Sequence, residues 1–294
     1  MTKYSIDAVI VTYNPDIRLL LDNVKAIINQ VDKIFIVDNG SDNLDQWNSL
    51  INSSNVSVFP LLENKGIAYA QNFGIKKSKE QSSDWVLTLD QDTILPTSYV
   101  VEIMRNHFPS KVGIISGRFI DRSWKEINSI YNEKPNIEEV NEIISSGNIV
   151  NICAWKNVGG FDENLFIDYV DFDFDYKLHR QEYGIYRVNN VVFEHEIGNG
   201  IPESMIKTFL GLKKKHVFDH SAYRLYYINR NRIIVRAKFP EYGSPYKMIV
   251  RELINLKEIL LFEKPKVNKL RFSIKGIFAG IYYLFSGRYL DETN

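Results

Sequence analysis

Short apolar runs that alternate with helix-forming segments set the fold class of this 294-residue chain. The predicted strands are residues 6–11, 33–37, 56–59 and 85–89, and the predicted helices are residues 19–28 and 66–77. Strands that alternate with helices in this way pack as a mostly parallel, doubly wound α/β sheet.

The fourth predicted strand ends in two carboxylates, Asp90 and Asp92, separated by one residue. In an extended backbone, residues two apart point to the same side, so both carboxylates can face one point beyond the strand. Open α/β sheets bind ligands at that edge, and Mg²⁺ is usually held by one or two carboxylates while substrate phosphates complete its coordination. The pattern predicts a site for a divalent metal and a diphosphate. A solvated loop or a helix N-cap is the alternative for an isolated Asp-X-Asp.

Polar residues also follow the other three predicted strands. They are Thr12, Tyr13 and Asn14 after the first, Asp38 and Asn39 after the second, and Asn64 and Gly66 after the third. Because parallel strands end at one edge, these residues converge on one crevice, where a nucleotide would meet their amide and carboxylate groups. Taken singly, they are more typical of turns and helix caps. The sequence has neither a Gly-X-Gly-X-X-Gly nor a Gly-X4-Gly-Lys-Ser/Thr phosphate loop.

The second half of the chain continues the alternation. We expect a strand over residues 111–116, a polar surface loop with a short helix over 121–142, a strand pattern over 145–155, a helix that opens near Asp171, and a strand over 191–194 that ends in His195. A histidine between two carboxylates at a strand end is a candidate metal ligand, although a lone histidine is more often structural.

Four aspartates lie close together around the start of that helix, at residues 168, 171, 173 and 175. Asp171 falls at the N-terminal end, where the helix dipole and unpaired N–H groups favour a carboxylate, so an N-cap is its simplest role. Asp175 lies one turn later on the same face, whereas Asp173 points elsewhere and is expected to be solvated.

The charge is distributed unevenly along the chain. Residues 1–204 carry 18 Lys and Arg against 29 Asp and Glu, a net charge of −11, and residues 205–294 carry 18 against 7, a net charge of +11. We therefore expect an α/β domain over residues 1–204 and a basic, mainly helical extension over residues 205–294.

The single cysteine, Cys153, excludes an intramolecular disulfide, fits a reducing compartment and is expected to be a small core residue. The N-terminus lacks the charged and apolar regions of a secretion signal. The longest late apolar stretch, residues 276–287, is shorter than the about 20 residues that span a bilayer. We expect no transmembrane helix.

These segments together resemble the family-2 inverting glycosyltransferases of the GT-A fold, and more narrowly their bacterial rhamnosyltransferase branch. The matching residues are 11–14 (Val-Thr-Tyr-Asn), 37–41 (Val-Asp-Asn-Gly-Ser), 64–66 (Asn-Lys-Gly) with Ala70 and Asn72, 89–93 (Leu-Asp-Gln-Asp-Thr), 159–163 (Gly-Gly-Phe-Asp-Glu), 166–171 (Phe-Ile-Asp-Tyr-Val-Asp), His195 with Gly198, Tyr226 with Tyr227, and Arg230 with Asn231. The match covers about residues 5–235. No single motif is specific, but their order along the chain is.

The resemblance implies a nucleotide-sugar half over about residues 1–115, an acceptor half over about 116–204, and Mg²⁺ or Mn²⁺ as the cofactor. It makes Asp171 the catalytic carboxylate and Asp92 the principal metal ligand, with Asp90 and His195 nearby. The implied nucleotide contacts are Thr12, Tyr13, Asn14, Asp38, Asn39, Asn64, Gly66, Asn72 and Asp90, and the implied acceptor or diphosphate contacts are Trp155, Asp168, Arg230 and Asn231.

The implied reaction transfers a sugar, foremost L-rhamnose from dTDP-β-L-rhamnose, onto a hydroxyl of a lipid-linked saccharide in bacterial cell-surface polysaccharide synthesis. The chain departs from the general family at Val170, where an acidic residue is usual, and at Trp155, where many relatives carry Arg. A UDP-hexose or UDP-galactofuranose transferase, a non-catalytic saccharide-binding relative and a nucleotidyltransferase are the alternatives. A nucleotidyltransferase would release pyrophosphate, whereas transfer would release free dTDP or UDP.

The basic extension has three interpretations: a solvated helical face, a nucleic-acid groove or a surface for anionic membranes. An acidic sugar-nucleotide crevice in the same chain argues against nucleic acid. We favour a peripheral position on the cytoplasmic face of the cell membrane, because Lys and Arg residues such as Lys213, Lys214 and Lys215 contribute about 1 kcal/mol each near an anionic leaflet. The amphipathic residues 272–290 can lie in the same interface.

Overall fold

The computed structural model describes residues 4–109, 111–121, 135–195, 220–262 and 265–290. The chain forms two compact units, residues 1–196 and residues 197–294. The predicted domain boundary at residue 204 falls in the stretch 196–219, outside the described residues.

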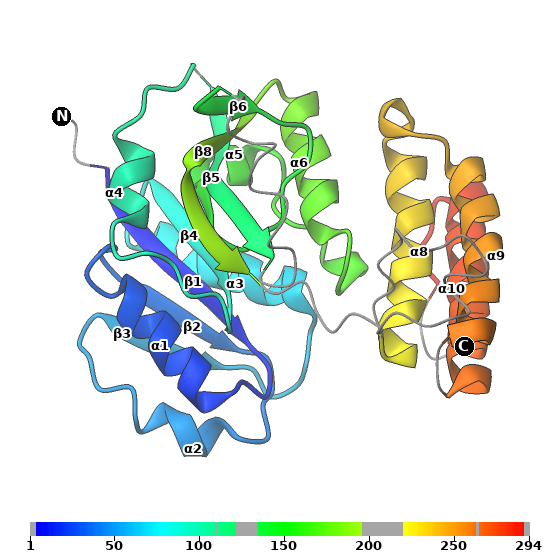
Figure 1. Ribbon diagram of the computed structural model, residues 1–294, viewed down its shortest axis with the longest axis horizontal. Helices are drawn as coiled ribbons and strands as arrows, with labels where there is room; N and C mark the ends of the chain where they lie inside the picture. Colours follow the sequence, from blue (N-terminus) through cyan, green and yellow to red (C-terminus); the bar gives the residue numbers. More distant parts are fainter. Residues whose placement is uncertain (1–3, 110, 122–134, 196–219, 263–264, 291–294) are drawn as a thin grey trace. The chain divides into compact units, whose positions relative to one another are not determined.

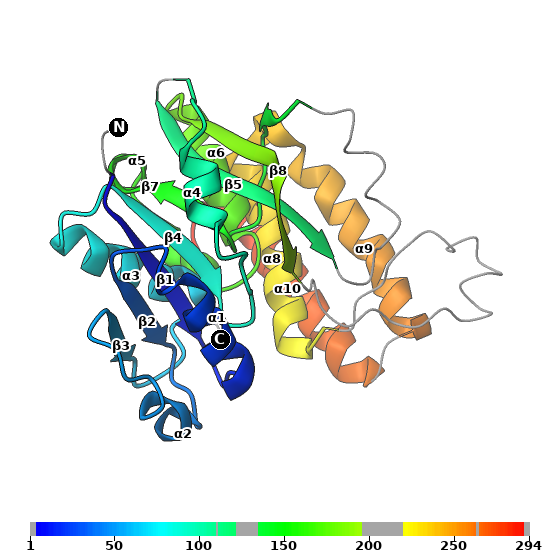
Figure 2. The same ribbon diagram turned by 60° about the vertical axis from the view of Figure 1, so that its left-hand side comes forward.

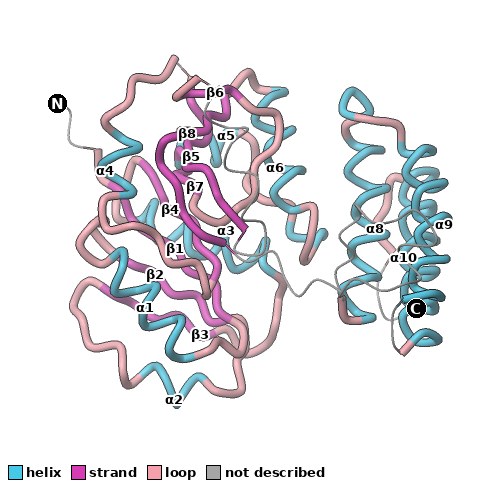
Figure 3. Tube along the Cα trace, in the orientation of Figure 1, coloured by secondary structure: helices cyan, strands magenta, loops and turns pink. Residues whose placement is uncertain are grey.

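A mixed sheet organises the first unit, and it has eight strands within the described ranges (Figures 1 and 3). The strands are β1 (Ile6–Thr12), β2 (Ile34–Asp38), β3 (Val56–Pro60), β4 (Trp85–Asp90), β5 (Val112–Asp121), β6 (Ile137–Glu139), β7 (Asn148–Asn151) and β8 (Gly184–His195). Their order across the sheet is β3-β2-β1-β4-β7-β5-β8-β6. β1 to β5 and β8 run in one direction, and β6 and β7 run in the other. The predicted mostly parallel sheet is confirmed.

Helices lie on both faces of this sheet, as a doubly wound fold requires (Figure 1). They are α1 (Ile17–Ile27), α2 (Leu44–Asn48), α3 (Ile67–Glu80), α4 (Tyr99–Met104), α5 (Ile152–Asn157), the 3₁₀ turn η2 (Glu163–Leu165) and α6 (Val170–Arg180). The predicted helices over residues 19–28 and 66–77 correspond to α1 and α3, with ends that differ by a few residues.

β1 shows why the central strands are apolar at every position. Ala8 and Ile10 belong to the same buried cluster as Leu20 of α1. Val9 points to the opposite face, where α3 approaches so closely that a Cβ added to Gly74 would lie 2.5 Å from Val9 Cγ1. A parallel strand covered on both faces must be apolar at successive residues, which explains the continuous run in the sequence.

The predicted strand over residues 145–155 is shorter in the structure, because β7 ends at Asn151 and α5 begins at once. The Asn151 side chain caps the helix: its Oδ1 accepts hydrogen bonds from Cys153 N at 2.9 Å and Ala154 N at 3.1 Å. Cys153 is exposed in this helix, so its predicted core position is wrong.

Residues 121–142, predicted as a surface loop with a short helix, contain a strand in their described part. Residues 137–139 form strand β6, which pairs antiparallel with β8. Residues 122–134 lie outside the described residues.

The second unit is helical where it is described, in agreement with the predicted helical extension. Its elements are α8 (Ala222–Lys238), the 3₁₀ turn η3 (Pro240–Tyr242), α9 (Pro245–Phe262) and α10 (Lys266–Ser286). The three helices pack side by side (Figure 2). Among the described residues, no helix combines the length and the apolar character that crossing a membrane demands.

The close approach of α3 to β1 gives a test of the packing. Gly74→Ala should destabilise the protein by about 1–3 kcal/mol, because its Cβ meets Val9, even though alanine is the better helix former. The measurement is the urea midpoint of the whole chain. Lys76→Ala on the exposed side of α3 is the control, with a change within about 0.5 kcal/mol. Gly74→Ala should cost less in a Val9→Ala background than alone, because the shortened side chain at residue 9 makes room for the added Cβ. An equal cost in both backgrounds, or a stabilised Gly74→Ala protein, would contradict the close approach.

Candidate active site

Buried Thr12 and Asp38 join the loops that follow β1 and β2. Thr12 Oγ1 donates a hydrogen bond of 2.9 Å to Asp38 Oδ1, and Ser41 N donates one of 2.9 Å to Asp38 Oδ2. Both Thr12 and Asp38 are almost fully buried. These two predicted nucleotide contacts therefore hold the loops in shape in this structure, as turn-forming residues do.

Asn14 makes a second connection between the same loops. Its backbone, at φ 47°, donates from N to Ser41 Oγ over 2.8 Å, and its Oδ1 accepts from Asp42 N over 2.8 Å. The neighbouring Tyr13 is 49% exposed. Its ring is therefore a large apolar group that this loop presents to solvent at the carboxyl edge of the sheet.

The loops after β2 and β3 are joined by Asn39 and Asn64. Asn39 Nδ2 donates to Asn64 Oδ1 over 3.0 Å, and Gly66 N donates to the same oxygen over 3.0 Å. Gly66 has φ 83°, and a Cβ there would lie 2.6 Å from Phe166 O, so only glycine fits. Asn64 itself is exposed at this edge.

The Asp90–Asp92 loop follows β4 at the same edge. Asp90 is half-buried and Asp92 is exposed. Between them, Gln91 accepts a hydrogen bond of 2.8 Å at Oε1 from Tyr13 N, which connects this loop to the one after β1. The predicted strand-end residues thus form one connected edge.

Asp171 is the second residue of α6, and Tyr169 rather than Asp171 occupies the N-cap position. The carboxylate accepts a hydrogen bond of 2.9 Å from Phe172 N. The pKa of this half-buried residue is raised to about 7, chiefly because the carboxyl is desolvated; the charges of Asp168 and Asp90 also raise it, and the hydrogen bond from Phe172 N lowers it. Asp171 therefore lies within electrostatic range of Asp90 at the end of β4.

The backbone just before Asp171 is strained. Phe166, Asp168 and Tyr169 have φ of 64°, 61° and 64°, a region that residues with a side chain rarely adopt. Phe166 O also accepts a hydrogen bond of 2.7 Å from Ile67 N, at the start of α3. Strain of this kind persists where the surrounding structure imposes it, and it is concentrated at functional sites.

Asp175 lies on the same face of α6 as Asp171, as predicted. It is buried, accepts a hydrogen bond of 2.7 Å from Ile143 N, and has a raised pKa because of burial and of the charges of Asp171 and Glu142. The prediction that Asp173 is solvated is wrong. Asp173 is fully buried, and Lys177 Nζ lies 2.9 Å from its Oδ2, so an ion pair one helical turn long compensates its charge.

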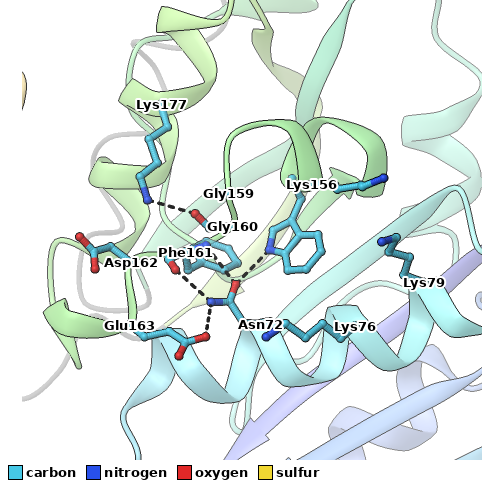
Figure 4. Close-up of a pocket in the computed structure, with 11 residues that line it drawn as sticks. Asn72, Lys76, Lys79, Lys156, Gly159, Gly160, Phe161, Asp162, Glu163 and Lys177 are labelled. Carbon is cyan, nitrogen blue, oxygen red and sulfur yellow. Dashed lines mark hydrogen bonds between the residues drawn. The ribbon is translucent and has the colours of Figure 1, made fainter.

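Asn72 and Trp155 meet in a pocket of about 470 Å³ (Figure 4). Asn72 Oδ1 accepts hydrogen bonds from Trp155 Nε1 and Phe161 N, each at 3.0 Å. Its Nδ2 donates to Phe161 O at 2.9 Å and Glu163 Oε1 at 2.8 Å, which fills the capacity of the amide. The lining includes neither Asp90 nor Asp171, and it consists of Asn72, Lys76, Lys79, Trp155, Lys156, Gly159, Gly160, Phe161, Asp162, Glu163 and Lys177.

The remaining predicted site residues are His195, Arg230 and Asn231. His195 ends β8, next to Asp121 of β5, and so belongs to the carboxyl edge by its backbone; its side chain is outside the described part. Arg230 and Asn231 are buried in the second unit, where Arg230 Nε donates to Asn231 Oδ1 over 2.9 Å. The Arg230 guanidinium lies 4.8 Å from the centre of the Tyr227 ring.

A family model described as glycosyl transferase family 2 matches residues 7–165, more than half of the chain. The chain belongs to glycosyl transferase family 2. The structure adds that the matched residues include the whole connected edge from Thr12 to Asp92.

Two curated relatives of this family-2 enzyme differ in how much of their length it matches. A dTDP-rhamnosyl transferase, RfbF of Shigella flexneri, is 28% identical over 96% of this chain and 97% of its own length. Hyaluronan synthase of Streptococcus pyogenes is 30% identical, but over 41% of this chain and 30% of the synthase. The match therefore covers almost the whole length of RfbF and less than a third of hyaluronan synthase.

Solved glycosyltransferases share the GT-A fold of this family-2 chain. GalNAc-T7 crystallised with UDP, GalNAc and Mn²⁺ superposes with a TM-score of 0.55 at 14% identity, over 87% of this chain and 58% of that one. Residues 1–349 of TarS from S. aureus, in complex with UDP-GlcNAc, superpose with a TM-score of 0.51 at 15% identity, over 96% and 73%. The predicted fold class is confirmed, and the protein is a glycosyltransferase.

The donor groups at the edge fit a hard divalent cation that is shared with phosphate. Asp90 and Asp92 supply carboxylate oxygens, and Mg²⁺ typically takes one or two of these together with substrate oxygens. Within the described residues, no group of three or more His, Cys, Asp or Glu side chains is placed to hold a metal by itself.

Three residues that hold the Asp90–Asp92 loop were missed by the sequence analysis: Gln91, Asn23 and Ser146. Asn23 Nδ2 donates to Asp90 O over 2.7 Å, and Ser146 Oγ accepts from Asp90 N over 3.0 Å. The sequence could have indicated Asn23, because it is a polar residue on the otherwise apolar face of α1. Ser146, far along the chain in a Ser-Ser-Gly run, carries no such sign.

The raised pKa of Asp171 gives a pH-dependent prediction. Between about 3.8 and about 7 the native carboxyl keeps a proton that the unfolded chain has lost, so wild-type stability falls as pH rises through this window. Asp171→Asn lacks this titration and should become progressively more stable than wild type up to about pH 7, where the difference levels off. The difference in Tm between the two proteins across this range measures it. Asp45→Asn, an exposed site on α2, is the control for losing a charge. A difference that stays constant would contradict the raised pKa.

Proposed function

We propose that this family-2 glycosyltransferase moves L-rhamnose from dTDP-β-L-rhamnose onto a hydroxyl of a lipid-linked saccharide, with inversion. The observation that carries the proposal is that Asp171 lies within electrostatic range of Asp90, at the carboxyl edge of the sheet, and has a pKa raised to about 7. The similarity of the chain to a dTDP-rhamnosyl transferase over nearly its whole length supports dTDP-rhamnose as the donor. Bacterial cell-surface polysaccharide synthesis is the setting that such an acceptor implies.

In this proposal Asp171 is the general base. A single displacement needs one carboxylate to take the proton of the acceptor hydroxyl as that oxygen attacks the sugar from the face opposite the leaving diphosphate. A carboxyl with a pKa of about 7 suits the role, because it accepts a proton more readily than an ordinary aspartate and is still largely ionised in mildly basic solution. Asp168, whose charge raises that pKa, would lie beside the acceptor.

The leaving group would be held at the strand ends. Bound Mg²⁺ or Mn²⁺ would neutralise the charge that develops on the departing diphosphate, and Asp92, Asp90 and His195 are the residues that would hold the ion. Exposed Tyr13, Asn14 and Asn64 are placed to contact the nucleotide, while Thr12, Asp38 and Asn39 keep their loops in position. Asn72 and Trp155 would act by bracing the loop 159–163 against α3 rather than by touching the donor.

A UDP-hexose or UDP-galactofuranose donor is the second candidate, and TarS with UDP-GlcNAc is the observation that favours it, because the fold is the same. A non-catalytic saccharide-binding protein is disfavoured by the retained Asp90, Asp92 and Asp171. Titration with dTDP-rhamnose, UDP-glucose and UDP-galactose, with released dTDP or UDP as the readout, separates the donors. Release of pyrophosphate instead would identify a nucleotidyltransferase.

Asp171→Asn tests the base directly. The rate of transfer should fall by about 10²–10⁴-fold, because no carboxylate remains to take the proton of the attacking hydroxyl. The affinity for dTDP should stay near that of wild type. Initial rates with dTDP-rhamnose and calorimetric titration with dTDP measure the two effects. Asp175→Asn, one turn further along α6 and buried, is the control for removing a carboxylate from the same face. Near-wild-type turnover of Asp171→Asn would remove Asp171 from the mechanism.

We also propose that α10 meets an anionic membrane surface on the cytoplasmic side. Ile274, Phe278, Tyr282 and Phe285 are between 37% and 77% exposed, and their spacing places them on one face of the helix. Residues 266–286 contain basic side chains and no Asp or Glu. A helix with an exposed apolar face and only positive charge suits an interface rich in anionic lipid. Lys213, Lys214 and Lys215, outside the described residues, would add to that attraction.

Vesicle flotation tests the membrane proposal. The protein should float with vesicles that contain phosphatidylserine and not with neutral vesicles, and salt should weaken the binding because it screens the charges. Phe278→Ser with Phe285→Ser, and separately Ala at residues 213–215, should each reduce it. Leu62→Ser, at an exposed apolar residue of the first unit, is the matched control. Absence of flotation with anionic vesicles at low salt would leave an ordinary basic helical unit.

A further inference from the structure

The backbone of Asp90 is held on both sides by buried side chains from distant parts of the chain. Asn23 of α1 donates from Nδ2 to Asp90 O over 2.7 Å. Ser146, which precedes β7, accepts at Oγ from Asp90 N over 3.0 Å and shares a hydrogen bond of 2.8 Å with Thr93 Oγ1. Asn23, Ser146 and Thr93 are each at most 1% exposed. Buried side chains therefore hold both ends of the loop between Asp90 and Thr93.

The sheet explains why a side chain is needed on one side of Asp90. The ladder between β4 and β7 ends at the pair Thr88 and Asn148, before it reaches Asp90. A backbone N–H that continues past the end of a ladder needs another acceptor when it is buried. The Ser146 hydroxyl supplies this acceptor, and through Thr93 it also fixes the far end of the loop.

Asn23 is a costly choice for the core, which indicates a role beyond stability. It lies on the buried face of α1 with Leu20, Val24 and Ile27, and its Oδ1 accepts no hydrogen bond from the part of the chain that the structure describes. A buried unsatisfied acceptor costs about 1–3 kcal/mol, which a leucine of similar size would avoid. The opposite amide orientation would place two acceptors, Oδ1 and Asp90 O, against each other, so the donor must face Asp90.

We infer that Asn23 and Ser146 are positioning residues for the metal-diphosphate site of the proposed function. They touch neither substrate nor metal. They set the path of the backbone from Asp90 to Thr93 and thereby the direction in which the Asp90 and Asp92 carboxylates point. A divalent ion demands ligand oxygens in a narrow range of geometry, so a loop that moves loses affinity for the metal with its nucleotide even when both carboxylates remain.

Asn23→Leu separates this role from a structural one. The change removes the unsatisfied Oδ1 together with one donor to Asp90 O, which keeps the hydrogen bond of 3.4 Å from Thr93 N, so the urea midpoint should stay close to that of wild type or rise. The affinity for dTDP in the presence of Mn²⁺ should nevertheless fall by about 10–100-fold, the loss typical for partners of metal ligands. In EDTA, where the ion makes no contribution, the variant and wild type should bind dTDP equally. Calorimetric titration measures both conditions.

Ser146→Ala is the second variant, and it keeps the inference testable if Asn23→Leu folds poorly. It should lower the urea midpoint, because Asp90 N loses its acceptor, and it should also weaken binding of dTDP with Mn²⁺. Ser78→Ala is its matched control: Ser78 is fully buried and donates to Asp7 Oδ2 over 2.8 Å, at the start of β1 and away from the site. Ser78→Ala should lose stability and keep wild-type binding of dTDP with Mn²⁺.

The outcomes distinguish this inference from the proposed function on which it rests. Asp92→Ala is the reference, and it should abolish the part of dTDP binding that depends on Mn²⁺. If Asp92→Ala does so while Asn23→Leu and Ser146→Ala bind dTDP with Mn²⁺ as tightly as wild type, the positioning role is overturned and the metal site stands. If Asp92→Ala binds dTDP with Mn²⁺ like wild type, the metal site is wrong and the positioning role fails with it.

Discussion

The site depends on one constraint: polar groups at the ends of buried parallel strands must find hydrogen-bond partners away from water. Asp38 illustrates it, since a carboxylate that is almost fully buried is stable only because Thr12 and Ser41 donate to it. The same need connects the loops of β1, β2, β3 and β4 one to the next. The resulting rigid edge holds exposed groups such as Tyr13 and Asp92 in place before any ligand binds.

Asp171, which feels the charge of Asp90, comes from a different part of the chain, and a strained segment precedes it. Ile67 N donates to Phe166 O, so the start of α3 fixes the turn that leads into α6. Positive φ at Phe166, Asp168 and Tyr169 costs on the order of 1–3 kcal/mol each, which contacts elsewhere in the domain must offset. The loop around Gly66 and the segment that leads to Asp171 are therefore joined by a direct backbone hydrogen bond.

The sequence predicted what local pattern determines, and it failed where distant packing decides. Apolar periodicity located β1 to β4 and α3, and the strand-end rule located Asp90 and Asp92. The same reasoning placed Cys153 in the core and Asp173 in solvent, because neither the capping of α5 by Asn151 nor the faces of α6 that become covered can be seen in a local window. The contact of Ser146 with Asp90 joins residues 56 positions apart, which a single sequence does not reveal.

Features that lower the stability of the fold gather near the candidate site, which marks it without reference to any motif. Asn23 leaves a buried oxygen without a partner among the described residues, Asp171 keeps a carboxyl whose charged form is disfavoured by burial, and residues 166–169 hold strained backbone. Each feature lowers stability, and each lies at or directly behind the carboxyl edge of the sheet. A chain selected for stability alone would replace them with a leucine, an asparagine and glycines. Their concentration at one edge is what is expected when a fixed arrangement of carboxylates contributes more to function than it costs in folding free energy.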